Sequence, residues 1–368
     1  MQYFAALGCR SPPCEKLVNP LALIKVDFMR ILAVFCSLFF ASFAAFGVDQ
    51  YTGEIEVASQ DETLRKEAMV GALGQVLVKV SGDPAAAGRP SLKSALENPE
   101  PLIQAYYYRQ EIDRSGVAPV MKLYYAANFD PRAISRLLSS SGLSQWARER
   151  PALMVWVAAD QNGSAALLHE SRLAPLMRRA NERGIVVKAA SIVADESGIE
   201  QLADVENREL DSLRQVAAKS GTPGVLAGRL YATEDGVVGR FGFSDGERNE
   251  QFEVRGVDAP AALRAAADET ANRLASRYAF DAADSAPVAV AAVIRGVSDA
   301  REFARVHAYL LSLSVVRSVS VSGAAAQTLN LNLVVAGGAE RLRQIVALND
   351  MLKVAGDSTD GALVFDAH

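Results

Sequence analysis

Hydrophobic and polar residues alternate along the chain with two different periods, and segments of the two kinds follow one another from residue 51 onward. Residues 51–58 (YTGEIEVA) alternate with the period of two that a β-strand requires. After Asp61 the apolar residues recur every three or four positions, which predicts a helix that ends at Gly82. The succession of strands and helices predicts an α+β protein with three small mixed domains, over residues 48–147, 151–280 and 287–368.

The first predicted domain contains a hairpin rich in tyrosine. Residues 104–113 and 120–130 have the pattern of two antiparallel strands, separated by the turn residues 114–116. Asp130 at the N-cap and Pro131 at the first position then predict a helix. Paired aromatic rings in a sheet usually serve packing, and a binding surface is the sharper alternative. The candidates for that surface are Tyr106, Tyr108 and Tyr124.

The second predicted domain has the order β-α-β-α-β-β-β-α, which is typical of a small mixed sheet with helices. It begins with an apolar strand at residues 152–159. Its last three strands are joined at residues 234–236 and 245–246, where Asp-Gly signals a hairpin turn. The helices are expected over residues 170–183, 202–220 and 258–278.

The third predicted domain has the order β-α-β-β-α-β, which is the ferredoxin-like split arrangement. Its helices are expected over residues 299–311 and 339–352. In the middle strands Val and Leu alternate with Ser and Asn, so helices should cover one face of the sheet and leave the other polar. That open face is either a docking surface or an ordinary solvated face. Its candidate residues are Ser320, Asn330 and Asn332.

The first 47 residues have the pattern of an extension followed by an export signal. From Met29, one Arg precedes an apolar stretch at residues 31–46, followed by small residues at Ala45 and Gly47. This pattern over residues 29–47 predicts a signal peptide, or an inner-membrane anchor if it stays uncleaved. Residues 1–28 show no pattern that could pack, so we expect an upstream extension there. The expected location is the periplasm, with membrane contact only through an uncleaved segment.

The net charge and the cysteine count are more informative when the positions of these residues in the chain are considered. The formal net charge is −5, and residues 1–48 hold four of the 38 basic and two of the 43 acidic residues, so the remainder carries −7. All three cysteines precede residue 37, which excludes a thiol enzyme and a Cys-ligated zinc site from the exported part. The mildly acidic balance gives no electrostatic footprint for nucleic acid. We therefore expect no nucleic-acid partner.

Motifs for catalysis are incomplete. Residues 242–246 (GFSDG) match the G-x-S-x-G nucleophile elbow around Ser244, but that elbow needs a helix after the serine and a strand is expected here. His169-Glu170 begins like a zinc motif, yet Leu173 stands where the second His is required. No phosphate-binding glycine loop occurs. We therefore expect no enzyme activity, no metal and no cofactor, with a serine hydrolase as a lesser alternative.

Several short runs together resemble a known family. They are VLVKVSGD at 76–83, QAYYY at 104–108, FDP at 129–131, the Trp of LSQWARERP and ALMVWVA at 152–158. In combination they resemble the uncharacterised envelope family known as domain of unknown function 2066, found in Gram-negative bacteria. This resemblance implies export to the periplasm and no assigned activity. The second domain, with GVLAGRL at 224–230, looks like the amino-terminal domain of TolB-type envelope proteins, which implies protein binding without chemistry.

Two functions of different classes follow from these patterns. The leading one is a non-catalytic interaction or assembly module of the periplasm, with other envelope proteins as partners. The alternative is a receptor for a small ligand between the first two domains, near Trp146, Arg148 and Arg150. The two arginines are interpreted first as an anchor at the domain junction and second as ligand contacts.

Overall fold

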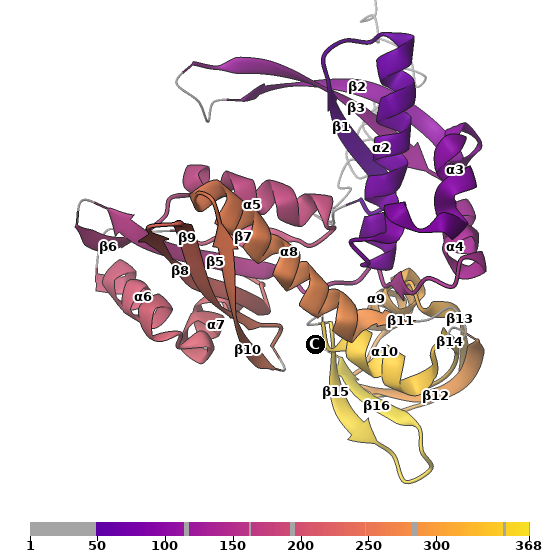
Figure 1. Cartoon of the computed structure of the whole chain (residues 1–368). Coiled ribbons are helices and arrows are strands. Elements are labelled where there is room, and N and C mark those ends of the chain that lie inside the picture. Colours follow the sequence, from indigo (N-terminus) through magenta and orange to yellow (C-terminus); the bar gives the residue numbers. More distant parts are fainter. Residues whose placement is uncertain are drawn as a thin grey trace, which may run out of the picture. The chain divides into compact units, whose positions relative to one another are not determined.

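The computed structural model describes residues 49–113, 118–161, 163–191, 196–246, 248–280, 286–348 and 351–367 (Figure 1). Residues 48–368 form one compact unit that contains four sheets and the helices that cover them. The α+β fold class is therefore confirmed, whereas the division into three domains stays a prediction. The expected signal segment and the residues before it lie outside the described part of the chain. Among the described helices, none is long and apolar enough to cross a membrane.

The first sheet is antiparallel, with the order β1-β3-β2. Its strands are β1 (Thr52–Val57), β2 (Ile103–Asp113) and β3 (Val120–Phe129). The helix α2 (Glu62–Ser81) covers one face and buries Leu73, Val76 and Leu77 against the sheet. It ends at Gly82, whose φ of 76° is the left-handed conformation that glycine adopts without a steric penalty. Shorter helical segments follow at η1 (Ala86–Gly88), η2 (Pro90–Leu92), α3 (Lys93–Glu97), η3 (Glu100–Leu102) and α4 (Pro131–Ser140).

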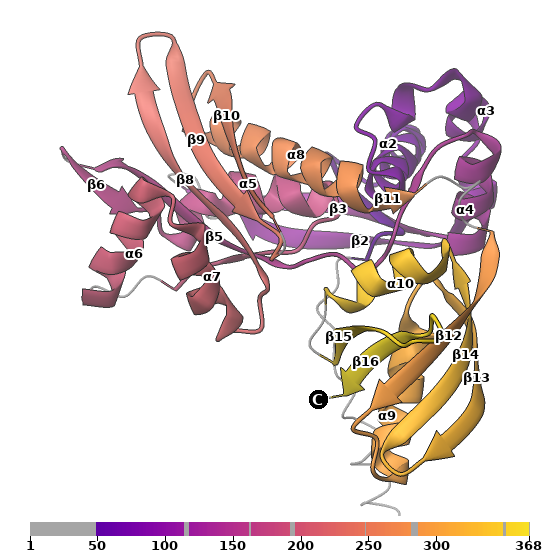
Figure 2. The same cartoon turned by 90° about the horizontal axis from the view of Figure 1, so that it is seen from below.

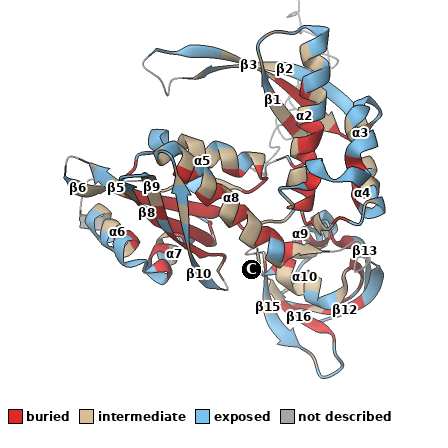
Figure 3. Cartoon of the chain, viewed as in Figure 1, coloured by how far each residue is buried: buried red, intermediate tan, exposed pale blue. Residues whose placement is uncertain are grey.

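The predicted hairpin is confirmed, and its far end extends beyond the sheet. β1 pairs with β3 only as far as Leu123, opposite Val57. Beyond that point β2 and β3 continue as a two-stranded ribbon, which Figure 1 shows projecting past β1. Figure 3 shows that this end is largely exposed. The predicted turn at residues 114–116 lies outside the described residues.

The second sheet has the order β10-β9-β8-β5-β6, with β7 also paired to β5. The strands are β5 (Leu153–Gln161), β6 (Ser164–Leu167), β7 (Val187–Ala189), β8 (Gly224–Thr233), β9 (Gly236–Ser244) and β10 (Asn249–Gly256). The helices α5 (Glu170–Glu182) and α8 (Ala259–Tyr278) cover one face, and α6 (Glu196–Asn207) and α7 (Leu210–Ala218) cover the other (Figure 2). Residues 202–220 are mostly helical, as expected, but they belong to two helices, because Arg208 adopts a φ of 58° and separates α6 from α7.

The third sheet has the order β13-β14-β12-β16-β15. It consists of β12 (Pro287–Arg295), β13 (Val316–Ala325), β14 (Thr328–Ala336), β15 (Leu352–Asp357) and β16 (Leu363–Ala367), with α9 (Ala300–Ser312) and α10 (Gly338–Val346). The helix expected to reach residue 352 ends at Val346, and the residues from Leu352 form the unpredicted strand β15. β16 folds back beside β15 and lies parallel to β12. The simple six-element arrangement is therefore extended by one strand.

A small fourth sheet joins segments far apart in the sequence. Trp146 in β4 (Gln145–Trp146) pairs with Ala279 in β11 (Ala279–Phe280). Trp146 is buried in the same cluster as α8 and α5. Glu149 accepts a hydrogen bond from the backbone N–H of Ser314 at 2.9 Å, which connects this segment to the start of β13. The stretch from β4 to Arg150 is therefore in contact with all three sheet regions.

Candidate functional site

Arg150 occupies a junction made of backbone carbonyl groups. Its guanidinium carbon lies 3.7 Å from the centroid of the Trp146 ring. Its Nη2 donates to the carbonyl oxygen of Lys79 at 2.6 Å, and its Nη1 donates to that of Gly184 at 2.6 Å. Its Nε donates to the carbonyl oxygen of Ala147 at 3.1 Å. Burial lowers the pKa of Arg150. The side chain is committed to joining the ends of α2 and α5, so it is not offered to a ligand.

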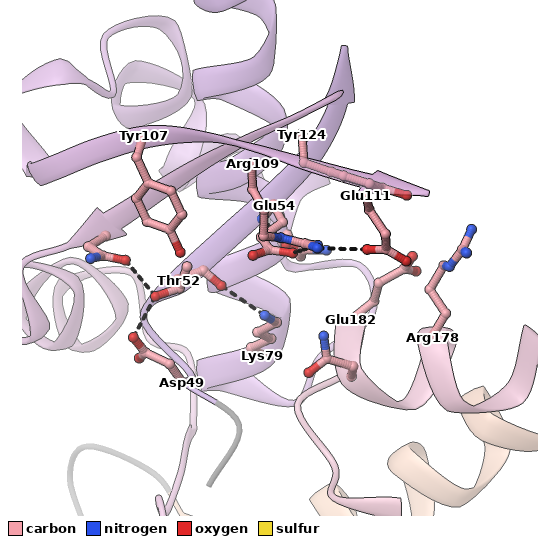
Figure 4. A pocket seen from close by; sticks show the side chains of 13 residues that line it. Asp49, Thr52, Glu54, Lys79, Tyr107, Arg109, Glu111, Tyr124, Arg178 and Glu182 are labelled. Atoms are coloured by element: carbon pink, nitrogen blue, oxygen red, sulfur yellow. Dashed lines mark hydrogen bonds and ion pairs between the residues drawn. The ribbon is translucent and has the colours of Figure 1, made fainter. Parts of the chain in front are cut away.

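A polar cleft of about 490 Å³ opens on the face of the first sheet opposite α2 (Figure 4). Alternate residues of the strands point to it, because neighbouring residues of a strand face opposite sides. Arg178 and Glu182 of α5 form the other wall. The residues of the sheet that Figure 4 labels in this polar cleft are Thr52, Glu54, Tyr107, Arg109, Glu111 and Tyr124.

Arg109 is already neutralised within the polar cleft. Its guanidinium lies 2.7 Å from a carboxylate oxygen of Glu111 and 2.9 Å from one of Glu54. The hydrogen bonds that Arg109 donates to Glu111 and Glu54 raise the pKa of Arg109. The guanidinium carbon also lies 4.9 Å from the centroid of the Tyr124 ring. This part of the cleft is a closed network of charges that stabilises the sheet face.

Lys79 is different, because it is buried at the edge of the polar cleft without an ion pair among the described residues. Only 3% of the residue is exposed, and Nζ donates one hydrogen bond, of 2.8 Å, to the carbonyl oxygen of Thr52. Burial lowers the pKa of Lys79 to about 8. The contact closes the outer edge of β1, which is a structural role. An ammonium group has two further N–H donors that a ligand in the cleft could use.

A second cleft, of about 860 Å³, lies beside Trp146 and is lined by four arginines. We call it the arginine cleft, and its arginines are Arg132, Arg136, Arg148 and Arg317. The first two lie on α4, four residues apart and therefore on one face of the helix. Sequence analysis singled out Trp146 and Arg148 but missed the other three arginines. The signal available was the spacing of Arg132 and Arg136, which Ser135 and Ser139 continue along the same helix face.

The three candidate tyrosines do not form one surface. Tyr106 and Tyr108 each have their ring centroid 5.6 Å from that of Tyr125, which is fully buried beneath α2. Tyr124 is next to Tyr125 in the strand and therefore points to the opposite face, beside Arg109. The packing of rings across the strands is as expected, strand alternation divides the three candidates between two faces, and their role in binding stays a prediction.

Ser320, Asn330 and Asn332 lie exposed on one sheet, away from both clefts. Ser320 is opposite Asn332, and its Oγ donates to the carbonyl oxygen of Asn332 at 3.0 Å. A register shift between Val321 and Gly323 places Gly323 opposite Asn330. The face is polar as expected, and its role in docking stays a prediction.

Ser244 lacks the geometry of an exposed nucleophile. The residue is fully buried at the end of β9, and its Oγ accepts a hydrogen bond from the backbone N–H of Gly246 at 3.3 Å. The neighbouring Asp245 accepts a hydrogen bond from the Tyr278 hydroxyl at 2.9 Å and pairs with Arg277. The next element is the strand β10, so the helix that an elbow requires is replaced by a hairpin. The hydrolase alternative gains no support from this site.

His169 and the carboxylates offer no metal centre in the described residues. His169 serves as the N-cap of α5, where its Nδ1 accepts a hydrogen bond from the backbone N–H of Ser171 at 3.3 Å. Across the described ranges, no three residues among His, Cys, Asp and Glu gather closely enough to hold an ion.

Comparison with known proteins identifies one family over part of the chain. Residues 44–147 match the model of a family described as Domain of unknown function (DUF8605). Neither a curated protein nor a solved structure matches the chain. This match covers the first sheet, its helices and the segment that ends beside Trp146.

The family match corrects the expected resemblance. The similarity to domain of unknown function 2066 is wrong, since a different family model matches, and nothing supports the likeness to TolB. The runs that suggested it are residues that commonly begin or end a helix. VLVKVSGD is the end of α2 with its glycine cap, and FDP is the N-cap and first residue of α4. Such helix caps occur in many unrelated proteins, so they do not identify a family.

Proposed function

We propose that the protein is a non-catalytic binding protein of the bacterial envelope and that it binds another envelope protein through the ribbon of β2 and β3. The observation that carries this proposal is the set of large apolar side chains exposed on that ribbon. Ile112 is 51% exposed, Val120 is 56% exposed and Met121 is 65% exposed. Ile112 and Met121 are directly opposite each other across the two strands.

A ribbon of two strands is only marginally stable in water by itself. Here Lys122 supports one side of it, with Nζ 3.1 Å from a carboxylate oxygen of Glu56 and 3.3 Å from one of Asp113. Exposure to water does not stabilise the apolar side chains at the end of such a ribbon. Contiguous exposed apolar surface rimmed by charges is typical of a protein interface. The ribbon therefore suits a partner with an apolar surface, which would bury the facing pair Ile112 and Met121, while Val120 points to the other face of the ribbon.

The location in the envelope is part of the proposal. It depends on residues 29–47, which have the pattern of a signal peptide or anchor. With the family resemblance removed, export is supported by that segment alone. The acidic net charge and the absence of cysteine after residue 36 agree with a small exported protein that has no nucleic-acid partner.

Position-specific crosslinking of the full chain in its native host tests the proposal. A photoreactive amino acid is placed at Met121 and, as the control, at Val257, which is 84% exposed in the turn before α8. We expect a discrete crosslinked partner at Met121 and none at Val257. The substitution Ile112→Asp should abolish the Met121 product while the melting temperature changes little. Identical products at both positions, or a Met121 product that survives Ile112→Asp, would contradict the proposal.

A further inference from the structure

We propose that the arginine cleft binds a small phosphate-bearing ligand through Arg132, Arg136, Arg148 and Arg317. The four side chains come from α4, from the segment after β4 and from β13, and they line one cavity of about 860 Å³. Cavities of roughly 300–1,000 Å³ are the usual size of small-molecule sites. This site is separate from the exposed ribbon, so the two proposals stand or fall independently.

The four guanidinium groups have no ion pair or hydrogen bond to any described residue, whereas many other described arginines are paired with carboxylates. Arg109, Arg179 and Arg273, for example, each contact two carboxylates. Four cations around one cavity repel one another, and that repulsion is relieved when an anion binds among them. Other described arginines, such as Arg172 and Arg295, have no ion pair either, but these four line one cavity, and their convergence there points to a ligand that supplies the negative charge.

The carboxylates that border the arginine cleft are occupied by other donors. Asp49 accepts hydrogen bonds from the backbone N–H of Tyr51, at 3.0 Å, and from the Thr52 hydroxyl, at 2.5 Å. Glu149 accepts from the backbone N–H and the hydroxyl of Ser314. Asp49 thus bonds to donors in its own segment and Glu149 bonds to Ser314 near the start of β13, and neither carboxylate forms an ion pair with the four arginines. Of these two carboxylates only Asp49 lines the cavity, against four arginines, so the lining is net cationic.

The chemistry of the donors favours phosphate. A guanidinium group presents N–H donors in a planar fork that matches two oxygens of a phosphate. A phosphate group has enough oxygens to contact forks from different directions, as the α4 arginines and Arg317 would require. Tyr51 and Phe280 also line the cleft and offer half-buried aromatic surface to an organic part of the ligand. A phosphoester of modest size satisfies both features, and its source is a soluble metabolite or a lipid headgroup.

Calorimetric titration of the full chain with phenyl phosphate and with inorganic phosphate tests the proposal. The test variant is Arg136→Gln with Arg148→Gln. The matched control is Arg172→Gln with Arg295→Gln, which removes the same charge from two exposed arginines outside the cleft that also have no ion pair in the described chain. We expect saturable binding of phenyl phosphate that weakens roughly tenfold or more in the test variant. The control should bind as the wild type does, and added salt should weaken binding in both.

The outcomes distinguish the two possible sources of the phosphate group from results that contradict the proposal. Vesicles of phosphatidylcholine with and without phosphatidylglycerol form a second arm. If the chain binds the anionic vesicles and phenyl phosphate displaces it from them, the ligand is a lipid headgroup. If the chain binds phenyl phosphate but not the vesicles, the ligand is a soluble phosphoester. No saturable binding of either phosphate at millimolar concentration would overturn the proposal. Equal weakening in the test and control variants would overturn it as well, because the effect would then be one of net charge.

Discussion

Arg183 Nη2 donates a hydrogen bond to the carbonyl oxygen of Gly82, 3.2 Å away, and so fastens the end of α5 to the residue that ends α2. Only 1% of Arg183 is exposed. Its Nη1 lies 2.6 Å from a carboxylate oxygen of Asp268, and its Nη2 also donates to Oδ1 of Asn272 at 2.8 Å. One buried cation thus connects α2, α5 and α8.

Replacing Arg183 should therefore destabilise the chain strongly. Arg183→Met leaves the Gly82 carbonyl and Asn272 without their buried donor, while Arg179 still pairs with Asp268. We expect a loss of about 2–3 kcal/mol in the free energy of unfolding, measured by urea denaturation. Arg172→Met, on an exposed position of the same helix, should change it by less than about 0.5 kcal/mol. Similar losses in the two variants would show that the junction contributes little.

Gly82 itself should tolerate no side chain. A Cβ atom added there would lie 2.5 Å from the Cβ of Ala275, in addition to the left-handed φ of 76°. Gly142 has a comparable φ of 65° but open space around the same position. We expect Gly142→Ala to cost about 1 kcal/mol from the backbone alone. Gly82→Ala should cost a further 1–3 kcal/mol, roughly, from overpacking against α8. Equal melting temperatures for the two variants would contradict the close approach of α2 and α8.

The stability of the protein should depend on pH through Lys79. Its pKa in the folded chain is about 8, below the ordinary value of 10.5, because burial disfavours the ammonium form. The unfolded chain therefore binds more protons between these two values, and stability from this residue rises with pH across that window. We expect the difference in unfolding free energy between wild type and Lys79→Met to move by about 2 kcal/mol in favour of wild type between pH 8 and pH 10.

Lys122→Met provides the control for that measurement. Hydrogen bonds that Lys122 donates to Glu56 and Asp113 raise the pKa of Lys122, so its contribution is lost only above the ordinary lysine value. The difference between wild type and Lys122→Met should thus stay flat between pH 8 and pH 10. Parallel pH profiles for wild type and Lys79→Met would show that Lys79 is not desolvated.

The hydroxyl group of Tyr125 should be dispensable, although its ring is not. The ring is fully buried between Tyr106 and Tyr108, and the hydroxyl has no hydrogen-bond partner among the described residues. Tyr125→Phe removes a buried, unpaired polar group and should leave the stability unchanged or raise it by about 1 kcal/mol. Tyr125→Ala should cost about 3–5 kcal/mol through the cavity it creates. A marked loss in Tyr125→Phe would reveal a partner for the hydroxyl.

Local chemistry explains which elements were predicted correctly. Asp130, Asp258 and Asp299 each cap the helix that follows, by accepting hydrogen bonds from its first backbone N–H groups. These caps depend on residues three positions apart, so the sequence shows them directly. The strands β6 and β15 were missed because each is short and exists through pairing with a neighbour, β5 or β16. The break at Arg208 has no glycine or proline to announce it.

The candidate sites were predicted less completely, because their partners are distant in the chain. Trp146 and Arg148 were selected from the sequence, and both border the arginine cleft. Arg317 joins them only because β13 begins beside Glu149 through the Ser314 hydrogen bonds. The three candidate tyrosines are divided between two faces, since neighbours in a strand point to different faces.

The sequence by itself determined the α+β class, the periods of its strands and helices, their caps, and a Cys-free, acidic chain after residue 48. These features depend on residues within one or two turns of each other. The tertiary structure alone decided that Arg150 binds carbonyl groups 34 and 71 residues away and that Lys79 loses its solvent. It also decided that four arginines share one cavity. Burial and charge pairing depend on which segments pack together, and no local pattern encodes that.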